Sequence, residues 1–318
     1  MNCPQGARAP APLVAFCGVD LAYLRAHPQQ LPTFLKHQRI RETPVPGGDI
    51  ADASRLTFDD GSSVFAKSWP EGAGPLPPGF FAAEAAGLRW LAVPGAAPVP
   101  EVIAELDDML VLEWVEPGEP TPRAAEEFGR GLAALHRAGA PAFGADWAGY
   151  IGRLPLDNTP SPGPWPSWFA ERRLAPYLRM SADRGALTPA DVALVERVLA
   201  DIDQYAGAAG AEPPARVHGD LWPGNVHWAA DGRAWLIDPA AHGGHRETDL
   251  ALLALFGCAP HIDRIRDAYH EAYPLADGWR ERLPLHQLYL LLVHTAQFGA
   301  AFRDAVVEAT RAVLRAGR

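Results

Sequence analysis

The chain has 318 residues, of which 48% are hydrophobic and 21% are charged, and its formal net charge is −10 at pH 7. This composition is typical of a globular protein with one or two sizeable cores, and it excludes a chain that is mainly disordered. The acidic balance argues against a nucleic-acid partner, which would require a basic surface for phosphate contacts.

Cysteine content and hydropathy narrow the class of protein further. The three cysteines stand at unrelated spacings, which favours neither a disulfide scaffold nor a zinc site. The most apolar stretch, residues 285–302, contains two histidines and two glutamines, so we expect no membrane-spanning helix and no membrane partner. Residues 1–13 lack the basic and apolar regions of a signal peptide and are expected to form a frayed tail. We therefore predict a cytoplasmic protein.

The first part of the chain is predicted to be rich in strands. Residues 55–67 alternate between apolar and polar side chains and are predicted to form a β-hairpin, with Asp60-Gly61 as a two-residue turn. A helix is expected over residues 80–92 and an apolar strand over residues 109–115. That strand stops at Glu116-Pro-Gly118, which we interpret as the start of a connector.

Helices dominate beyond residue 121. They are predicted over residues 123–137, 165–184, 189–204, 247–256, 262–273 and 284–315, with one β-hairpin between them at residues 225–238. The pattern predicts an α+β fold in two lobes: a tail and lead-in (1–30), a small β-rich lobe (31–117) and a larger helical lobe (118–318). Two lobes joined by a short connector usually enclose a ligand.

The most informative segment lies just before the second hairpin. Residues 217–225 read Val-His-Gly-Asp-Leu-Trp-Pro-Gly-Asn, so Asp220 stands five residues before Asn225. This is the spacing of the H-R-D-L-x-x-x-N catalytic loop of kinases. There the Asp accepts the proton of the substrate hydroxyl and the Asn helps to bind magnesium. Asp220 is therefore a candidate base and Asn225 a candidate Mg²⁺ ligand.

The second hairpin supplies a further candidate ligand. If Asp231-Gly232 is a two-residue turn, Asn225 and Asp238 face each other at the open end. Opposed residues have Cβ atoms roughly 4.5–5.5 Å apart, so an amide oxygen and a carboxylate could share one hard cation. The alternative is that Asp220, Asn225 and Asp238 are ordinary turn and cap residues. Their joint spacing around one hairpin favours the metal site.

A kinase also needs a cation on the nucleotide phosphates, oriented by a carboxylate. Lys67 ends the second strand of the first hairpin, on the same face as Phe65. Glu84 lies on the apolar face of the predicted helix, where an unpaired buried carboxylate is costly. Lys67 is the natural partner, so the kinase pattern as a whole predicts a Lys67–Glu84 ion pair. Considered alone, these two residues favour the alternative of a solvated lysine and a glutamate at the edge of the apolar stripe.

Other candidate nucleotide contacts are less specific. Gly47-Gly48 could let backbone amides approach phosphates, although such a pair is often a simple turn. Glu113, Trp114 and Val115 lie in the strand before the connector, where an adenine could bind backbone groups; the alternative is an ordinary core strand. The sequence contains no G-x-x-x-x-G-K-[ST] motif, which disfavours a Walker-type NTPase.

The remaining polar residues have simpler interpretations. His136 is expected to be a packed, hydrogen-bonded helix residue, and Asp249 could cap the helix that follows it. His242 and His245 are expected in a loop. Without cysteine or acidic neighbours at ligand spacing, they make a poor metal site.

Seven segments carry a resemblance to a known family: Gly47-Gly-Asp-Ile50, Val64-Phe-Ala-Lys67, Phe80-Phe-Ala-Ala-Glu-Ala-Ala-Gly-Leu88, Leu112-Glu-Trp-Val-Glu-Pro-Gly118, His218-Gly-Asp-Leu-Trp-Pro-Gly-Asn225, Ile237-Asp-Pro-Ala240 and Arg246-Glu-Thr-Asp-Leu-Ala251. Together they resemble the fructosamine kinase (ketosamine-3-kinase) family. That family belongs to the aminoglycoside-phosphotransferase-like branch of the protein-kinase fold. The resemblance extends from about residue 38 to about residue 315.

The resemblance implies a bilobal protein-kinase-like fold and a defined activity. The family uses ATP and Mg²⁺ to phosphorylate the sugar 3-hydroxyl of ketoamines, which form from sugars and amines or protein lysines. The phosphorylated product breaks down and releases the amine, so the activity amounts to deglycation. The implied partner is a free ketoamine or a glycated protein, and the sequence indicates no particular oligomeric state.

The resemblance also implies a role for each matching residue. Asp220 would be the base, Asn225 and Asp238 the magnesium ligands, and Lys67 with Glu84 the phosphate anchor. Trp222 would form a wall of the sugar site, and His218 and Asp249 would support the catalytic loop. One departure lies downstream, where Ala241-His-Gly-Gly-His-Arg246 replaces the Tyr-Tyr-Gly-Asp-Arg type of run that the family usually has.

Two alternative functions share most of these residues. A kinase of the aminoglycoside or choline phosphotransferase type would use the same catalytic set and differ only in the substrate wall. A nucleotide-binding pseudokinase would bind nucleotide without transferring phosphate. The pseudokinase is disfavoured because the candidate base, metal ligands and phosphate anchor are all present.

Overall fold

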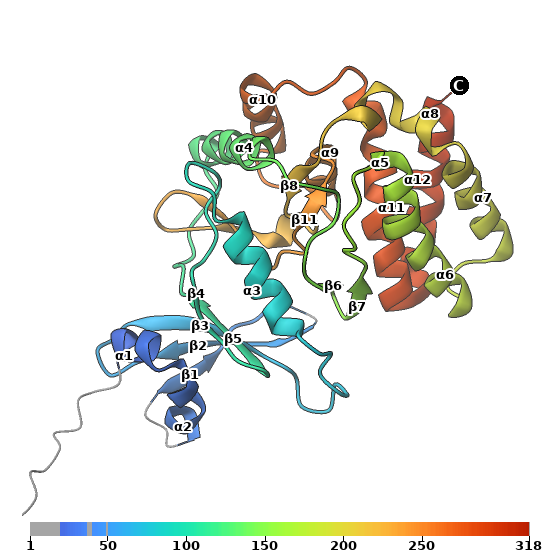
Figure 1. The fold of residues 1–318 in the computed structure, drawn as a ribbon. Coiled ribbons are helices and arrows are strands. Elements are labelled where there is room, and N and C mark those ends of the chain that lie inside the picture. The colour runs from blue at the N-terminus through green and yellow to red at the C-terminus, as the bar shows by residue number, and fades with distance from the viewer. Residues whose placement is uncertain (1–19, 37–39, 49, 318) are drawn as a thin grey trace, which may run out of the picture.

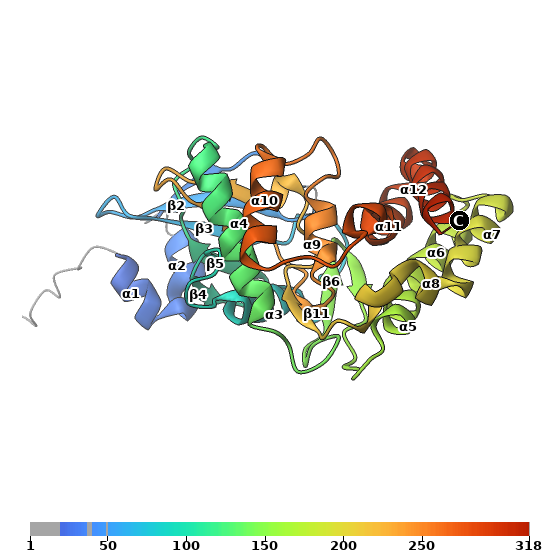
Figure 2. The ribbon, with the colours of Figure 1, turned by 90° about the horizontal axis from the view of Figure 1, so that it is seen from above.

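The computed structural model describes residues 20–36, 40–48 and 50–317, so the expected tail at residues 1–13 lies outside the described residues. The chain forms a small β-rich lobe and a larger helical lobe (Figure 1), in agreement with the predicted α+β, two-lobed architecture. The C-terminal helix lies at the end of the molecule farthest from the small-lobe sheet in both views (Figures 1 and 2). None of the described helices is long and apolar enough to cross a lipid bilayer.

The small lobe is built on a five-stranded antiparallel sheet with the strand order β1-β2-β3-β5-β4. Its strands are β1 (Arg41–Pro44), β2 (Asp52–Thr57), β3 (Ser63–Ser68), β4 (Val102–Glu105) and β5 (Met109–Glu113). Side chains of β5 alternate between the two faces, as expected for a strand covered on both sides. Leu110 and Leu112 pack in one apolar cluster with helix α3 (Phe80–Leu91), and Val111 packs in another with Leu24 and Leu31.

Two short helices precede the sheet, where the sequence analysis assigned no element. They are α1 (Leu21–Ala26) and α2 (Leu31–Lys36), and each buries one leucine completely. Each shows too few apolar positions for a helical period to be recognised, because a helix of six residues makes less than two turns. Their packing covers the face of the sheet that α3 leaves open.

Both hairpin loops have three residues, so the prediction of two-residue turns is wrong. In the first hairpin Thr57 pairs with Ser63, and the Phe58 amide donates to the Ser62 carbonyl at 2.9 Å, so the loop has three residues. A two-residue type I′ turn would need positive φ at both central positions. Gly61 has φ 83°, but Asp60 is not among the described residues with positive φ.

The second hairpin repeats this geometry. Val226 pairs with Leu236 between β9 (Val226–Trp228) and β10 (Ala234–Leu236), and the Ala229 amide donates to the Arg233 carbonyl at 2.9 Å. The Ile237 amide accordingly donates to the Asn225 carbonyl at 3.2 Å. Asn225 therefore lies opposite Ile237, and the predicted pairing of Asn225 with Asp238 is wrong.

Helices form most of the large lobe. They are α4 (Pro122–Arg137), α5 (Trp165–Phe169), α6 (Ala175–Asp183), α7 (Pro189–Ala200), α8 (Ile202–Ala206), α9 (Glu247–Leu252), α10 (Ile262–Ala272), α11 (Trp279–Phe298) and α12 (Arg303–Ala316). Helix α4 packs along α10, and α11 packs along α12, α9 and α6. Threonine side chains cap α4 and α7, and a proline follows each cap at the first helical position.

Several predicted helices are shorter or interrupted. The helix expected over 284–315 is divided at Gly299, whose φ of 81° ends α11 before a 3₁₀ turn leads into α12. The helix expected over 165–184 contains a π-helical segment, Ala170–Leu174, between α5 and α6. The expected loop around His242 is instead a strand, β11 (His242–Gly244), paired with β8 (Ala215–Val217). A third short hairpin, β6 (Gly149–Ile151) with β7 (Leu154–Leu156), lies near α3.

Candidate active site

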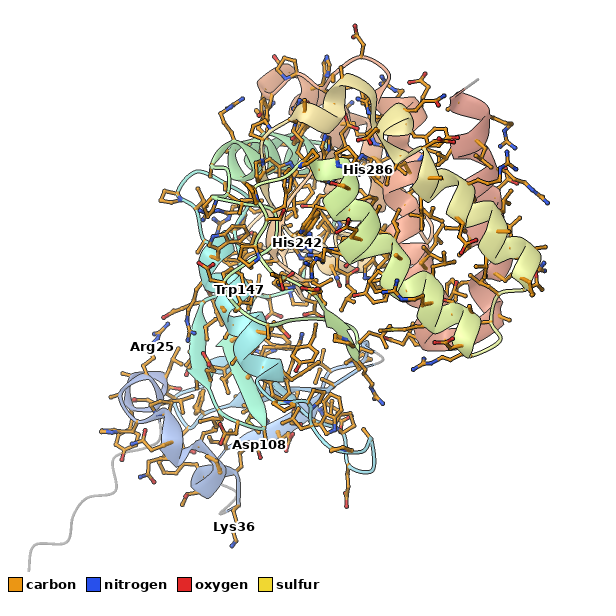
Figure 3. The ribbon with its side chains drawn as sticks, turned by 45° about the vertical axis from the view of Figure 1, so that its right-hand side comes forward. Arg25, Lys36, Asp108, Trp147, His242 and His286 are labelled. Atoms are coloured by element: carbon orange, nitrogen blue, oxygen red, sulfur yellow. The ribbon has the colours of Figure 1, made fainter. Side chains whose placement is uncertain are left out.

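A cavity of about 980 Å³ is lined by residues of both lobes. The small lobe contributes Lys67 and Glu84, and the large lobe contributes Asp220, Asn225 and Asp238. Trp147, which also lines the cavity, lies where the lobes meet in Figure 3, whereas His242 and His286 lie inside the large lobe. The topology therefore brings five predicted site residues to one cavity.

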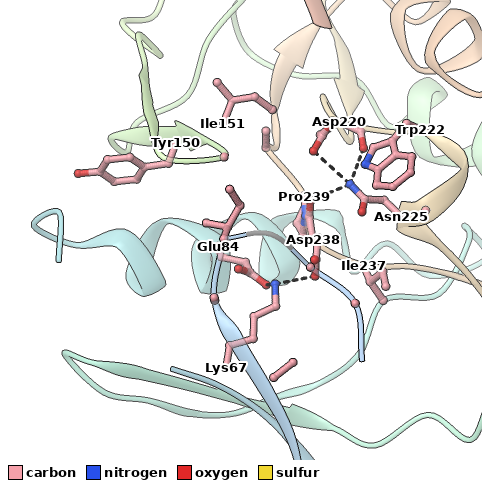
Figure 4. A pocket seen from close by; sticks show the side chains of 18 of the residues that line it. Lys67, Glu84, Tyr150, Ile151, Asp220, Trp222, Asn225, Ile237, Asp238 and Pro239 are labelled. Atoms are coloured by element: carbon pink, nitrogen blue, oxygen red, sulfur yellow. Dashed lines mark hydrogen bonds and ion pairs between the residues drawn. The ribbon is translucent and has the colours of Figure 1, made fainter. Parts of the chain in front are cut away.

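Lys67 contacts one carboxylate from each lobe (Figure 4). Its ammonium donates to Glu84 Oε1 at 2.8 Å and to Asp238 Oδ1 at 2.6 Å. The predicted ion pair with Glu84 is present because the strand period of β3 and the helical period of α3 turn both side chains into the cavity. The contact with Asp238 joins residues 171 positions apart.

Charge in this cluster is not fully compensated. Burial alone would lower the pKa of Lys67, but the carboxylates of Asp238 and Glu84 raise it, so the ammonium stays charged. Burial raises the pKa of Glu84, although Lys67 opposes that shift. One ammonium therefore serves two carboxylates, and Asp220 adds a third carboxylate to the same cavity.

Backbone conformation turns Asp238 toward Lys67. Its φ is 55°, in the left-handed region that non-glycine residues adopt at a cost of roughly 1–3 kcal/mol. Asp238 comes two residues after the end of β10, and this conformation takes it out of the hairpin register. Its side chain remains 39% exposed, so one carboxylate oxygen contacts Lys67 while the group still faces the cavity.

Asp220 has one satisfied and one unsatisfied carboxylate oxygen. Asn225 Nδ2 donates to the Asp220 backbone carbonyl at 2.7 Å and to Asp220 Oδ2 at 3.1 Å. Asp220 Oδ1 is buried and has no hydrogen-bond partner in the described structure. Burial, and then the nearby Asp238, raise the pKa of Asp220 well above its ordinary value. A buried acceptor without a donor is costly, so this oxygen is suited to receive a hydroxyl from a ligand.

Asp249 supports the loop that presents Asp220. Its Oδ2 accepts from the His218 amide at 2.7 Å and its Oδ1 from the Gly219 amide at 3.0 Å. Burial would raise the pKa of Asp249, but its hydrogen bonds with His136 and Gly219 lower it. Asp249 lies inside α9, after Arg246 at the N-cap, so the alternative of a simple helix cap is wrong. His136 is buried and hydrogen-bonded, as predicted.

His218 ties the same loop to the second hairpin. Its Nδ1 accepts from the Asp220 amide at 3.2 Å, so the proton is on Nε2, which donates to the Ile237 carbonyl at 2.8 Å. Burial lowers the pKa of His218 and favours this neutral form. The bond to Ile237 fixes the segment immediately before Asp238.

The less specific nucleotide candidates also line the cavity. Gly47 and Gly48 have φ of 115° and 85°, which only glycine adopts readily. Glu113, Trp114 and Val115 lie at the end of β5. The Val115 carbonyl accepts from His227 Nε2 at 3.0 Å, which links the connector to the second hairpin.

A polar group behind the cavity was missed by the sequence analysis. Arg173 is fully buried and donates to Asn158 Oδ1 at 2.8 Å, to the Asp157 carbonyl at 2.7 Å and to His242 Nε2 at 3.4 Å. Asn158 lines the cavity, and its Nδ2 is buried without a hydrogen-bond partner among the described residues. Arg173 lies inside a predicted helix, where an arginine normally indicates a solvated position, so only the tertiary contacts identify it.

A second buried cluster, His245, Glu247 and His286, has ligand atoms within 4.8 Å of one another. Arg282 donates to Glu247 Oε1 at 2.6 Å and to Oε2 at 2.9 Å, so the carboxylate is already compensated. His245 Nε2 donates to the Ala209 carbonyl at 2.9 Å, and His245 Nδ1 accepts from the Glu247 amide at 3.2 Å. Both ring nitrogens are therefore engaged by the backbone, and the cluster is a structural network.

Neutral His245 predicts a pH-dependent stability. Burial, with a contribution from His286, lowers the pKa of His245 to about 4, whereas an unfolded histidine titrates near 6.5. The unfolded state binds a proton that the folded state excludes, so stability is full above pH 6.5 and decreases as pH falls toward 4. Between pH 7 and pH 5 we expect wild type to lose about 2 kcal/mol more unfolding free energy than His245→Gln. Urea unfolding at both pH values measures the difference.

The exposed His27 provides the matched control for this experiment. His27→Gln should keep the full pH dependence of wild type, because the substitution lies at an exposed position and leaves the buried His245 unchanged. An equal pH dependence in His245→Gln and wild type would contradict the assignment.

The fold and the site can be compared with known proteins. The sequence model of the fructosamine kinase family matches residues 26–316. This chain belongs to the fructosamine kinase family. A Thermus thermophilus protein named probable ketoamine kinase is 38% identical over 270 residues, which cover 85% of this chain and 92% of that protein.

Solved structures agree with this family membership. A crystal structure from Thermobifida fusca, named as a fructosamine-3-kinase, is 54% identical with a TM-score of 0.80, and the match covers 87% of this chain and 94% of that chain. An aminoglycoside phosphotransferase in complex with gentamicin has a TM-score of 0.59 at 12% identity, covering 90% of this chain and 95% of that chain. The latter shows a shared fold.

These matches confirm the predicted family and the bilobal, protein-kinase-like phosphotransferase fold. As a member of the fructosamine kinase family, the chain is a phosphotransferase with ATP as its implied phosphate donor.

Proposed function

We propose that the chain is an ATP- and Mg²⁺-dependent ketoamine kinase that phosphorylates the sugar 3-hydroxyl of fructosamine- or ribulosamine-type substrates. The product would break down to release the amine, which makes the activity a deglycation repair. The observation that carries the proposal is Asp220 Oδ1, which is buried without a hydrogen-bond partner in the described part of the chain and lies in the same cavity as the Lys67–Glu84–Asp238 network. A base and a phosphate anchor in one cavity suit phosphoryl transfer to a hydroxyl, and family membership supports a ketoamine acceptor.

Asp220 is the proposed general base. A sugar hydroxyl that donates to Asp220 Oδ1 would give this oxygen a hydrogen-bond donor, while Asn225 Nδ2 donates to Asp220 Oδ2. The raised pKa of Asp220 strengthens it as a proton acceptor. In the reaction the hydroxyl oxygen forms a bond to the γ-phosphorus, the bond to the ADP leaving oxygen breaks, and the hydroxyl proton moves to Asp220.

The chain's own residues fit a divalent cation. Asn225 uses its amide nitrogen for Asp220, which leaves its amide oxygen for a cation, and Asp238 presents a partly exposed carboxylate. Three carboxylates with one ammonium leave negative charge that a hard cation would compensate. Bound Mg²⁺ would neutralise charge on the transferring phosphoryl group. Lys67, oriented by Glu84, would contact the nucleotide phosphates.

A substrate panel tests the proposal. The purified protein with Mg²⁺ and ATP should release ADP in the presence of fructosamine and ribulosamine derivatives, and not with gentamicin or choline. Nuclear magnetic resonance of the product should locate the phosphate on the 3-hydroxyl, and free amine should appear as the product decays. Absence of turnover with every ketoamine would overturn the proposal, and nucleotide binding without any transfer would favour the pseudokinase.

A further inference from the structure

One part of the cavity has no role in the transfer step described above. Its wall is a continuous aromatic cluster, here called the aromatic rim, made of Trp222, Phe256, His294, Phe298 and Phe302. Ring centroids lie 6.1 Å apart for Trp222 and Phe256, 4.7 Å for Phe256 and His294, and 5.0 Å for His294 and Phe302. The ring centroids of Phe298 and Phe302 lie 6.0 Å apart.

The aromatic rim begins next to the reacting groups. Trp222 stands two residues after Asp220 in the same loop, and its ring covers Gly224, where an added Cβ would lie 2.2 Å from the indole. The rest of the rim comes from the segment after α9 and from the end of α11 with the 3₁₀ turn that follows it. A substrate whose hydroxyl reaches Asp220 can therefore extend over Trp222 onto the other rings.

Two members of the rim are unusually exposed. Phe256 is 40% exposed and Phe298 is 44% exposed, and among the described residues only Tyr23 is another large hydrophobic residue of this exposure. Exposed aromatic side chains gathered at the mouth of one cavity indicate a binding site for an apolar group.

Backbone geometry singles out Phe256 further. It has φ 53°, a left-handed conformation that is costly for a bulky side chain. Cys258, two residues on, has φ 61°. Such conformations persist where the surrounding structure imposes them. Here the conformation places the phenyl ring of Phe256 in contact with the rings of Trp222 and His294.

The charges around the cavity complement this apolar wall. The cavity is lined by four carboxylates, Glu84, Glu113, Asp220 and Asp238, and Lys67 already contacts two of them. No aromatic-rim residue or neighbouring lining residue of α11 brings a carboxylate to the cavity. A polycationic acceptor would require several carboxylates on this wall, whereas one ammonium-type nitrogen can bind over an indole face.

We propose that the aromatic rim binds the amine-derived substituent of the ketoamine and selects substrates in which that substituent is aromatic or long and aliphatic. The inference rests on the proposed ketoamine kinase function and adds the class of amine to it. The sugar lies between Asp220 and Trp222, the ketoamine nitrogen contacts the Trp222 face, and the substituent packs on Phe256 and Phe298.

Two ketoamines with the same sugar test this inference. One is made from benzylamine and the other from ethanolamine, so they differ only in the substituent. We expect wild type to have at least about a tenfold higher kcat/KM for the benzyl compound, with the difference mainly in KM. A single methylene group in a hydrophobic pocket already changes discrimination by roughly 10- to 200-fold, and a phenyl ring buries more apolar surface than that. In Phe256→Ala and in Phe298→Ala the ratio of the two kcat/KM values should fall about tenfold. In Phe256→Trp, which keeps an aromatic ring at this position, the ratio should stay near the wild-type value.

Tyr23→Ala is the matched control, because Tyr23 is equally exposed but does not line the cavity. It should leave the substrate ratio unchanged, and thermal melting should show that all variants fold. Equal kcat/KM for both ketoamines, or a ratio that the Phe256 and Phe298 variants do not change, would overturn the subsite while the kinase function stands. Failure to phosphorylate either ketoamine would overturn the proposed function, and the subsite with it.

Discussion

Asp220→Asn is expected to lower kcat for ketoamine phosphorylation by about 10²- to 10⁴-fold, the usual contribution of a positioned general base. The amide has the shape of the carboxylate but cannot accept the hydroxyl proton. Thermal stability should stay the same or rise, because burial disfavours the ionised form of Asp220 in the folded state. Steady-state kinetics and a melting curve on the same preparation measure both effects.

Asp203→Asn provides the matched control for Asp220, since Asp203 is exposed and does not line the cavity. It should retain wild-type kcat and melting temperature. A kcat for Asp220→Asn within a factor of a few of wild type would remove Asp220 from the role of base.

Asp238→Asn is expected to abolish Mg²⁺-dependent phosphoryl transfer, with a loss on the order of 10³-fold or more. The substitution removes a carboxylate from the proposed metal site and one of the two partners of Lys67. Asparagine tolerates the left-handed φ of 55°, and Lys67 keeps Glu84 at 2.8 Å, so the fold should persist. The measurements are ATP turnover against Mg²⁺ concentration and the thermal shift produced by Mg²⁺ with ADP.

The thermal shift reports metal-nucleotide binding without relying on turnover. It should shrink strongly in Asp238→Asn and remain at the wild-type value in Asp231→Asn, a substitution in the exposed turn of the same hairpin. An unchanged Mg²⁺ midpoint and an unchanged shift in Asp238→Asn would refute its assignment as a metal ligand.

Predictions based on short-range periodicity agree best with the structure. The face of a side chain on a strand or helix depends on its position within a period of two or 3.6 residues. For this reason Lys67 on β3 and Glu84 on α3 were correctly expected to meet. Asp220 and Asn225 stand close in one loop, and their contact follows from a spacing of five residues.

Predictions that needed backbone angles or packing partners were less accurate. An Asp-Gly pair is compatible with a two-residue or a three-residue hairpin loop, and both hairpins here adopt the longer one. The predicted register of the second hairpin therefore differs from the observed register by one residue. Gly299 divides the C-terminal helical region because its φ of 81° ends α11, and an apolar period does not report such an angle.

The sequence by itself determined the family, the division into strand-rich and helical regions, and the identity of the groups that carry the proposed chemistry. It could do so because motif spacing and side-chain periodicity are local properties of the chain. Only the tertiary structure decided that Lys67 contacts Asp238 and that three distant segments form the aromatic rim. These contacts join residues far apart along the chain, so they depend on how the lobes and helices pack and not on the order of neighbouring residues.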